Sequence, residues 1–226
     1  MLSDYLDKII NGDCLEVMRE LPDGCVDAVI TDPPYGISLS PQRGLTDPIA
    51  NDGRDDAKRL WASFVPEAFR VARADSASLF FSGWSEVWVK DLLAEYFTVK
   101  ACVVWVKNVW GIGYYTRPQH EFAWYCHKGK PPTPDEPQSD VWNFPREMSP
   151  LHSCQKPVAL LKKAVRFCAP EGAVILDPFL GSGTTAVACK ETGRHYIGIE
   201  IEPKYCDIAR RRVAEATPSL FMEVML

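Results

Sequence analysis

The sequence predicts an α/β fold in which helices cover both faces of a mostly parallel β-sheet. Short apolar segments alternate with amphipathic ones along the chain, which is the order that βαβ units produce. The segment 26–31 is almost continuously apolar, as a strand buried on both faces should be. A glycine-rich turn at 181–183 joins an apolar run to a helical one, and such turns at strand ends are where open α/β sheets bind ligands.

The first part of the chain predicts two strands, a helix and a long loop. Residues 8–12 form a short strand that ends at a Gly-Asp pair. Residues 14–21 carry apolar side chains at helical spacing and end at a Pro-Asp-Gly turn. After the strand at 26–31, the polar segment 36–56 is rich in proline and glycine. We expect a loop there, and loops of this length in compact domains are usually functional or disordered.

The middle of the chain continues the alternation. A helix over 59–72 has its apolar residues on one side, and it precedes a strand at 77–82 and a helix at 86–96. Residues 99–106 and 122–126 read as strands that flank a loop rich in glycine and aromatic residues.

A proline-rich segment precedes the last group of elements. Residues 130–150 contain six prolines, so the segment is expected to be extended and not helical. The remaining elements are predicted in the order helix, strand, helix, strand, helix, over 157–168, 173–176, 183–192, 195–199 and 203–216.

The bulk composition is that of a soluble protein of one domain, over 1–226. The hydrophobic fraction is 46% and the charged fraction 24%. The first residues lack the plan of a signal peptide, and no apolar run approaches the roughly 18 residues of a membrane span. We therefore expect a cytoplasmic protein without membrane contact.

The 8 cysteines are scattered and form no Cys-x-x-Cys pair, which suits reduced thiols that act as small hydrophobes. A zinc site built from His120, Cys126, His127 and Cys154 is disfavoured because the spacing matches no ligand pattern. We expect no metal.

The net charge of the chain and its local distribution point in opposite directions about nucleic-acid binding. A net charge of -5 and a pI near 5.4 disfavour a protein that coats nucleic acid, because non-specific affinity comes mainly from neutralised phosphates. Residues 100–130, however, carry five lysines and arginines against one acidic residue, Glu121, with seven aromatic residues interleaved. This segment is either a local nucleic-acid-binding face or a solvated face beside core aromatics.

The glycine turn indicates a cofactor site. Glycines let the backbone approach a ligand, and the helix that follows offers free amide groups. Glu200 ends the next strand, where an acidic residue can accept hydrogen bonds from ribose hydroxyls. The glycine spacing also fits a dinucleotide, but Asp177 at the mouth of the loop would oppose its phosphates. A carboxylate at that place better suits the cationic methionine end of S-adenosylmethionine.

A second loop, Asp32-Pro33-Pro34-Tyr35, follows the buried strand at 26–31. Together with the downstream segment Asp177-Pro178-Phe179-Leu180-Gly181-Ser182-Gly183-Thr184, it resembles the amino-group DNA methyltransferases, which methylate N6 of adenine or N4 of cytosine. The order of the loops, catalytic first and cofactor last, is similar to their permuted β class. The resemblance extends from about Ile9 to Val213. It implies a Rossmann-like class I methyltransferase fold, circularly permuted, with a mostly parallel seven-stranded sheet.

The resemblance also implies roles for individual residues. Asp13 would contact the cofactor adenine and Lys156 the methionine carboxylate, with Ser182 and Thr184 as lesser candidates for the same end. A helix N-cap is an alternative role for Asp13. The implied cofactor-binding residues are Asp13, Lys156, Asp177, Phe179, Gly181, Ser182, Gly183, Thr184 and Glu200, and the implied catalytic residues are Asp32, Pro33, Pro34 and Tyr35.

The chemistry of the Asp-Pro-Pro-Tyr loop accounts for its residue types. The lone pair of an exocyclic amine is delocalised into the base, so the amine is a poor nucleophile. Asp32 and the Pro33 carbonyl can each accept one amine hydrogen, and the prolines hold these acceptors in a rigid frame. Tyr35 offers a flat surface for an extruded base, worth roughly 1–3 kcal/mol.

The resemblance implies double-stranded DNA as the partner and a short target-recognition insertion over 128–154. Because this insertion is small, we expect help from 36–56 or from a second subunit in a homodimer. The candidate DNA contacts are Trp110–Arg117, Trp142 and Arg146.

Adenine is favoured because the cytosine enzymes more often carry Ser in place of Asp32, and N4 of cytosine is the alternative. RNA or a protein glutamine amide as substrate is disfavoured by Asp in place of Asn at position 32. A binding module with a regulatory cofactor pocket is disfavoured by the intact Asp32 and Tyr35.

Overall fold

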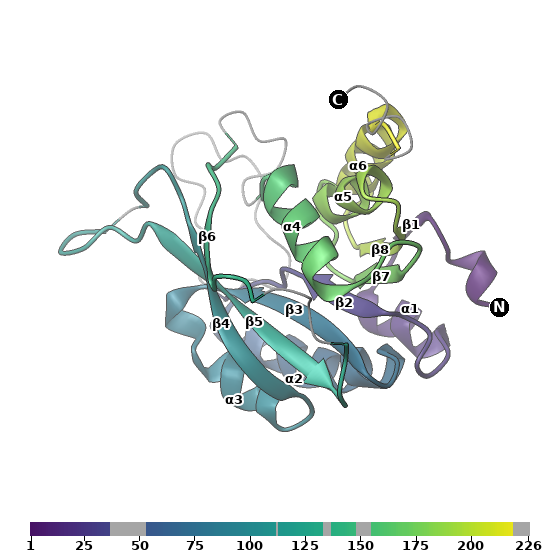
Figure 1. Cartoon of the computed structure of the whole chain (residues 1–226), viewed down its shortest axis with the longest axis horizontal. Helices are drawn as coiled ribbons and strands as arrows, with labels where there is room; N and C mark the ends of the chain where they lie inside the picture. Colours follow the sequence, from purple (N-terminus) through teal and green to yellow (C-terminus); the bar gives the residue numbers. More distant parts are fainter. Residues whose placement is uncertain (37–52, 112, 133–136, 148–154, 219–226) are drawn as a thin grey trace.

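The computed structural model describes residues 1–36, 53–111, 113–132, 137–147 and 155–218 of the chain. Its centre is a sheet with the strand order β1-β8-β7-β2-β3-β5-β4-β6 (Figure 1). The strands are β1 Lys8–Asn11, β2 Ala28–Thr31, β3 Ser76–Ser82, β4 Thr98–Val106, β5 His120–Lys128, β6 Val141–Asn143, β7 Val174–Asp177 and β8 His195–Glu200. The helices are α1 Cys14–Glu20, α2 Arg54–Val71, α3 Trp88–Ala94, α4 Val158–Cys168, α5 Thr184–Glu191 and α6 Pro203–Glu215, with 3-10 turns at Leu2–Asp4 and Trp84–Glu86.

The sheet is mostly parallel, as predicted. Only β5 runs against its neighbours β3 and β4, because it returns from β4 through a hairpin and lies between the two. The described sheet has eight strands where seven were predicted. The additional strand β6 comes from the proline-rich segment and pairs with the outer edge of β4, where a short proline-free stretch can still donate hydrogen bonds. Trp142, which is 1% exposed, anchors β6 in the core.

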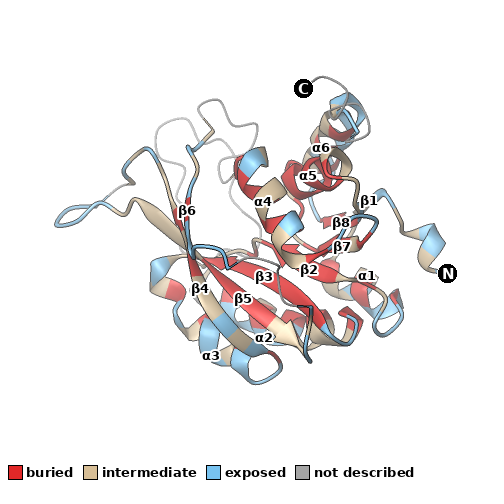
Figure 2. Ribbon diagram, in the orientation of Figure 1, coloured by how far each residue is buried: buried red, intermediate tan, exposed pale blue. Residues whose placement is uncertain are grey.

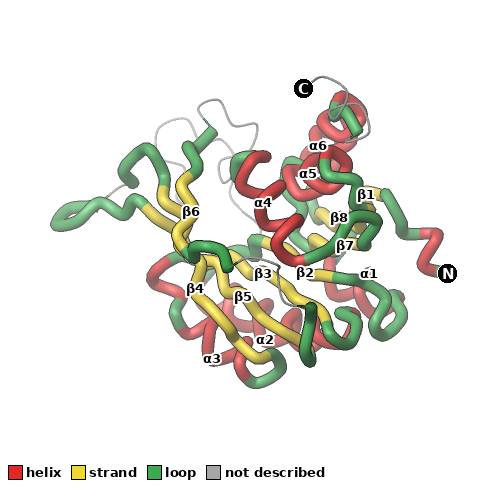
Figure 3. Tube along the Cα trace, in the orientation of Figure 1, coloured by secondary structure: helices red, strands yellow, loops and turns green. Residues whose placement is uncertain are grey.

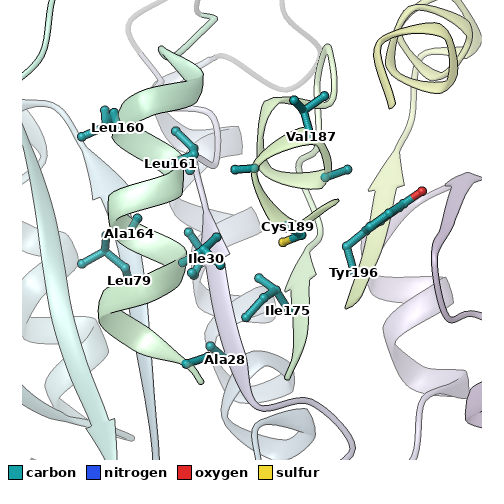
Figure 4. Close-up of a cluster of buried hydrophobic side chains, with 14 of the residues drawn as sticks. Ala28, Ile30, Leu79, Leu160, Leu161, Ala164, Ile175, Val187, Cys189 and Tyr196 are labelled. Carbon is teal, nitrogen blue, oxygen red and sulfur yellow. The ribbon is translucent and has the colours of Figure 1, made fainter. Parts of the chain in front are cut away.

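Helices cover both faces of the sheet, which confirms the predicted layers. Helices α1, α2 and α3 lie on one face and α4, α5 and α6 on the other (Figures 1 and 3). Each face has its own cluster of buried side chains. Figure 4 shows one of them, in which Leu161 and Ala164 of α4 and Val187 of α5 meet Ile30 of β2 and Ile175 of β7. Strands β2, β3, β7 and β8 are buried along almost their whole length (Figure 2).

The structure confirms the circular permutation. The first strand, β1, pairs in parallel with the last strand, β8. The last helix, α6, packs beside β1, and Arg210 on α6 donates a hydrogen bond of 3.0 Å to the Ile9 carbonyl. The beginning and the end of the described chain thus meet as consecutive units of one sheet, as circular permutation requires.

Four helix starts differ from the prediction, those of α2, α3, α4 and α5. Helix α2 begins at Arg54, within the predicted loop, and Asp55 and Asp56 in its first turn favour a helix N-terminus. Helix α4 begins at Val158, with Pro157 as its N-cap. Residues 37–52 of the predicted loop lie outside the described residues. Within the described chain, no helix combines the length and the apolar character needed to cross a bilayer.

Gly183, the N-cap of α5, ends the glycine-rich turn 181–183 and packs closely against α6. Its φ is +87°, and a Cβ atom there would lie 2.6 Å from Cβ of Ala209. We predict that Gly183→Ala lowers the free energy of unfolding by about 2–5 kcal/mol, because backbone strain and overpacking add. Urea denaturation measures the loss.

Gly172→Ala is the matched control. Gly172 has a φ of +77°, but no atom lies within 4 Å of the added Cβ, so this variant tests strain alone. It should lose about 1–2 kcal/mol. Equal losses in the two variants would contradict the packing role of Gly183.

Candidate active site

Four neighbouring strands each present a carboxylate at one edge of the sheet. In the order β1-β8-β7-β2, these are Asp13 after β1, Glu200 at the end of β8, Asp177 at the end of β7 and Asp32 after β2. All four line one cavity of ≈ 570 Å³. This volume lies within the range of about 300–1,000 Å³ that small-molecule sites occupy. The structure therefore brings the two predicted loops together in one site.

Glu200 is tied to the glycine loop by backbone hydrogen bonds. Its Oε2 accepts from the amide of Gly181 and its Oε1 from the amide of Glu202, each at 2.8 Å. Burial raises the pKa of Glu200, and the backbone amides partly offset that rise. Because a carboxylate offers about four acceptor positions, these two bonds leave room for ligand hydroxyls.

Asp177 connects the loop after β7 to β2. Its Oδ1 accepts hydrogen bonds from the Thr31 hydroxyl at 2.7 Å and from the Phe179 amide at 3.1 Å. Burial raises the pKa of Asp177 to about 6, although hydrogen bonds from Thr185 and Thr31 act in the opposite direction. A charged ligand group at this carboxylate would compensate for its burial.

The other predicted cofactor residues also line the cavity or shape its loop. Asp13 is the N-cap of α1, and its Oδ1 accepts from the amides of Leu15 and Glu16 at 2.8 and 3.2 Å. It also lines the cavity, so both roles considered for it are compatible with its position. The Phe179 ring packs edge to face against Phe64, with ring centroids 5.2 Å apart.

Arg212 on α6 fixes the serine and threonine of the loop. Its guanidinium donates to the Ser182 carbonyl at 2.7 Å, to the Ser182 hydroxyl at 2.9 Å and to the Thr184 hydroxyl at 3.1 Å. The Ser182 hydroxyl also bonds the Gln155 side chain at 3.1 Å. Arg212 was not among the predicted site residues, because it lies near the far end of α6.

The Asp-Pro-Pro-Tyr loop is held by outside partners, Trp61 and Lys156, and by a hydrogen bond within the loop. The Trp61 indole, on α2, donates a hydrogen bond of 3.1 Å to the Pro34 carbonyl. The hydroxyl of Tyr35 donates to Oδ1 of Asp32, and the ammonium of Lys156 donates to Oδ2. Both oxygens of Asp32 are therefore engaged by the protein.

Lys156 lies with the Asp-Pro-Pro-Tyr loop in this structure. Its side chain is 7% exposed, and its ammonium stands 4.8 Å from the centroid of the Phe81 ring and 5.9 Å from that of Trp105. The expected partner of Lys156 was the methionine carboxylate of the cofactor. Here its ammonium is shared between Asp32 and Glu121, with 3.2 Å to Oε2 of Glu121.

Glu121, at the start of β5, is a site residue that the sequence analysis missed. Burial alone would raise its pKa, but Lys156 and Lys107 together hold the pKa of Glu121 below its ordinary value. Lys107 pairs with Oε1 of Glu121. The signal was present in the sequence, since Glu121 is the single acidic residue in the basic and aromatic segment 100–130.

The hairpin between β4 and β5 projects beyond the sheet. We call its residues 107–111 and 113–119 the finger; it is largely exposed (Figure 2). Tyr114 and Tyr115 are 94% and 95% exposed, and Trp110 is 63% exposed. The guanidinium of Arg117 stacks 5.6 Å from the Trp110 ring centroid. Trp110 also lines the cavity, so the finger leads from the site to solvent.

Trp142 does not belong to that surface. Because its side chain is buried under α4, the prediction that it contacts DNA is wrong. Arg146 does line the cavity, and its amide bonds Asn108 at 2.9 Å. Of the four residues considered for zinc, Cys154 lies outside the described residues. Among those described, no group of three or more His, Cys, Asp or Glu side chains is arranged to hold a metal ion.

Comparison with known proteins identifies the family. Residues 26–211, which include both loops, match the model of the N6/N4 DNA methylases. The chain belongs to this family. Its methylases modify exocyclic amino groups of DNA bases and use S-adenosylmethionine as the methyl donor.

Two methylases are similar to this chain in sequence. YubD of Escherichia coli (strain K12), a candidate methylase, is 33% identical over 214 residues, which cover 92% of this chain and 91% of YubD. The type II methyltransferase M.HinfI of Haemophilus influenzae is 26% identical over 271 residues, covering 96% of this chain and 71% of the relative.

Solved structures agree with the fold of the methylase. The complex of M1.HpyAVI with SAM superposes with a TM-score of 0.70 at 26% identity and covers 91% of this chain and 98% of that one. The PvuII DNA methyltransferase, which is cytosine-N4-specific, superposes with a TM-score of 0.74 at 14% identity, covering 96% and 90%. At that identity the second likeness shows the fold alone.

The raised pKa of Asp177 predicts a pH-dependent stability. Because its folded pKa of about 6 exceeds the ordinary 3.8, its contribution to stability is complete below pH 3.8 and is lost as the pH rises through 6. Asp177→Asn removes this titration and keeps an oxygen for Thr31 and Phe179. We predict that the variant gains about 1–3 kcal/mol over the wild type between pH 4 and pH 8.

Chemical denaturation of the unliganded proteins at both pH values measures this gain. Asp207→Asn, at an exposed carboxylate on α6 that pairs with Arg210, is the control and should show no such change. A stability difference between wild type and Asp177→Asn that does not vary with pH would contradict the burial of an ionised Asp177.

Proposed function

We propose that the chain is a site-specific DNA methyltransferase. It methylates the exocyclic amine of a base flipped out of double-stranded DNA, with N6 of adenine as the preferred acceptor. One observation carries the proposal: the Asp-Pro-Pro-Tyr loop after β2 and the glycine loop after β7 open into one cavity, because β2 and β7 are neighbours. Open α/β sheets bind ligands at such strand ends.

The residues of the cavity fit S-adenosylmethionine. Gly181 has a φ of +54° with no atom within 4 Å of an added Cβ, so its backbone is open to a ligand. Glu200 would accept hydrogen bonds from the ribose hydroxyls, Asp13 would meet the adenine, and Asp177 would face the cationic methionine end. Other residues that would hold it are Lys156, Phe179, Gly181, Ser182, Gly183 and Thr184. When bound, S-adenosylmethionine supplies the electrophilic methyl group.

The catalytic loop fits an exocyclic amine as the acceptor. The Asp32 carboxylate and the Pro33 carbonyl would each accept one amine hydrogen, which directs the nitrogen lone pair away from the ring. The Pro34 carbonyl already accepts from Trp61, which supports the assignment of the second acceptor to Pro33. The Tyr35 ring would stack on the flipped base.

Adenine is the preferred acceptor because residue 32 is Asp. The N4-cytosine enzymes of the family more often carry Ser where this chain has Asp32. Methylation of N4-cytosine is the alternative, and the PvuII enzyme shares this fold. RNA and protein amides are less favoured, because their methyltransferases carry Asn-Pro-Pro-Tyr.

We further propose that one cytoplasmic methyltransferase domain over 1–226 carries the activity. The segment 128–154 would serve as a short target-recognition insertion, of which 133–136 and 148–154 lie outside the described residues. A second subunit in a homodimer would extend the contact with DNA.

Methyl transfer from labelled S-adenosylmethionine to genomic DNA tests the function, and sequencing with modified-base detection identifies the base and its site. We predict that Asp32→Ala lowers the rate by at least about 100-fold, because the amine loses an acceptor. The affinity for S-adenosylmethionine should change little.

Glu200→Ala is the converse variant. It should weaken cofactor binding, seen as a reduced thermal stabilisation by S-adenosylmethionine. Near wild-type turnover by Asp32→Ala would refute its catalytic role, and equal stabilisation of Glu200→Ala and wild type would refute the ribose contact.

The finger carries a separate prediction about DNA binding. Tyr114 and Tyr115 lie edge to face, 5.1 Å between ring centroids, and are free to stack on bases. Replacing both by Ala should weaken the binding of a duplex that contains the target site by roughly 1–3 kcal/mol, measured by fluorescence anisotropy. Tyr96→Ala, at a 39% exposed tyrosine before β4 and at the opposite end of that strand, is the control. Unchanged affinity in the double variant would exclude the finger from the DNA contact.

A further inference from the structure

Glu121 lies within reach of both donors that occupy Asp32. The ammonium of Lys156 bonds one oxygen of Asp32 and lies 3.2 Å from Oε2 of Glu121. The hydroxyl of Tyr35 bonds the other oxygen of Asp32 and lies 3.5 Å from the same Oε2. One oxygen of Glu121 is therefore a second acceptor for the lysine and for the tyrosine.

The proposed chemistry needs an oxygen of Asp32 for the substrate. Asp32 must accept the amine hydrogen while Lys156 and Tyr35 each donate to one of its oxygens, and these two donors draw charge from the carboxylate and weaken it as an acceptor. A buried ammonium cannot be left without an anionic partner, since breaking a buried pair is strongly unfavourable. Asp32 thus becomes a stronger acceptor for the amine when another carboxylate takes over these donors.

We propose that Glu121 is a positioning residue that takes up Lys156 and the Tyr35 hydroxyl when Asp32 turns to the substrate amine; this inference rests on the proposed function. Glu121 does not touch the reacting atoms. It acts through Lys156, whose ammonium moves its hydrogen bond from one carboxylate to the other.

The surroundings of Glu121 suit this task. Lys107 pairs with Oε1, so that Oε2 is left toward Lys156 and Tyr35. The two lysines also hold the pKa of Glu121 below its ordinary value, which keeps the acceptor ionised at neutral pH. The backbone of Glu121 is fixed by its pairing with Trp105 across the β4–β5 ladder.

The carboxylate alternates with the lysines in one row. Lys107, Glu121, Lys156 and Asp32 carry charges of alternating sign, and each neighbouring pair is an ion pair. The exchange of Lys156 between two carboxylates leaves the net charge of the row unchanged. It therefore requires no proton and no ion from solvent.

The test replaces Glu121 by its neutral isostere. Glu121→Gln removes the charge of the carboxylate that would take over Lys156, so the ammonium stays on Asp32. We expect kcat on saturating DNA to fall by about 10- to 100-fold, the range that interaction energies between coupled groups produce. The KM for S-adenosylmethionine and the thermal shift that it induces should stay within about twofold of the wild type.

Glu191→Gln is the matched control. Glu191 on α5 also pairs with a lysine, Lys162, at 3.0 Å, but the pair lies outside the cavity. This variant should retain the wild-type kcat. Glu121→Asp, which keeps the charge on a shorter side chain, should have an intermediate kcat.

The double variant Glu121→Gln with Lys107→Gln distinguishes two roles of Glu121, the positioning of Lys156 and the neutralisation of Lys107. If Glu121 only neutralises Lys107, the double variant recovers the wild-type kcat, which would overturn the proposal; we expect it to remain slow. Unchanged kcat in Glu121→Gln overturns the proposal as well. If Glu121→Gln does not fold, Glu121→Asp replaces it in the test. A wild-type kcat in Glu121→Asp then overturns the proposal. Absence of methyl transfer by the wild type itself would instead refute the proposed function.

Discussion

The parallel pairing of β2 with β7 places Ala28 opposite Ile175 and Val29 opposite Leu176. It joins two loops that are far apart in the chain, and the hydroxyl of Thr31 completes the junction with a hydrogen bond to Asp177, 146 residues away. The apolar side chains of this junction are buried between α4 and α5 on one face and α1 and α2 on the other. If the register of β2 slipped by one residue, its side chains would exchange faces and Asp32 would leave the cavity.

The second constraint is the burial of charge against aromatic rings. Lys156 stands over Phe81 and Trp105, in surroundings where an unpaired ammonium would be strongly disfavoured. Asp32 and Glu121 together supply the compensating charge. Because the pairs share their partners, removal of any member affects the others, and the cluster behaves as a unit. The charge around the loop after β2 is thus balanced in part by a residue from a strand that makes no pairing with β2.

Most of the fold could be predicted because its signals are local. Apolar runs and helical spacing predicted the long elements, and the two loop motifs predicted the site at the strand ends. The short strand β6 was missed, since three residues between prolines carry no periodicity, and both its pairing with β4 and the burial of Trp142 are non-local. For the same reason, Trp142 was assigned to the surface.

Most of the predicted site residues follow parallel strands, and the residues that were missed lie elsewhere. Asp13, Asp32, Asp177 and Glu200 all lie at carboxyl ends of such strands. Glu121 lies at the amino end of β5, and that end reaches the cavity only because β5 is antiparallel. Strand direction is a non-local property, so the sequence could show an unusual acidic residue but not its neighbours. Arg212 was missed because helix packing brings it to the loop from far along the chain.

The hairpin origin of the finger has a consequence for divergence. The finger connects β4 to β5. The register of these two strands is set by their own ladder, which begins at the pair Val106 and His120 next to the finger. Residues 113–117 therefore can lengthen, shorten or change without moving the four carboxylates. If the finger contacts DNA as we propose, variation of this one exposed segment would change the DNA that is read while the four carboxylates keep their positions.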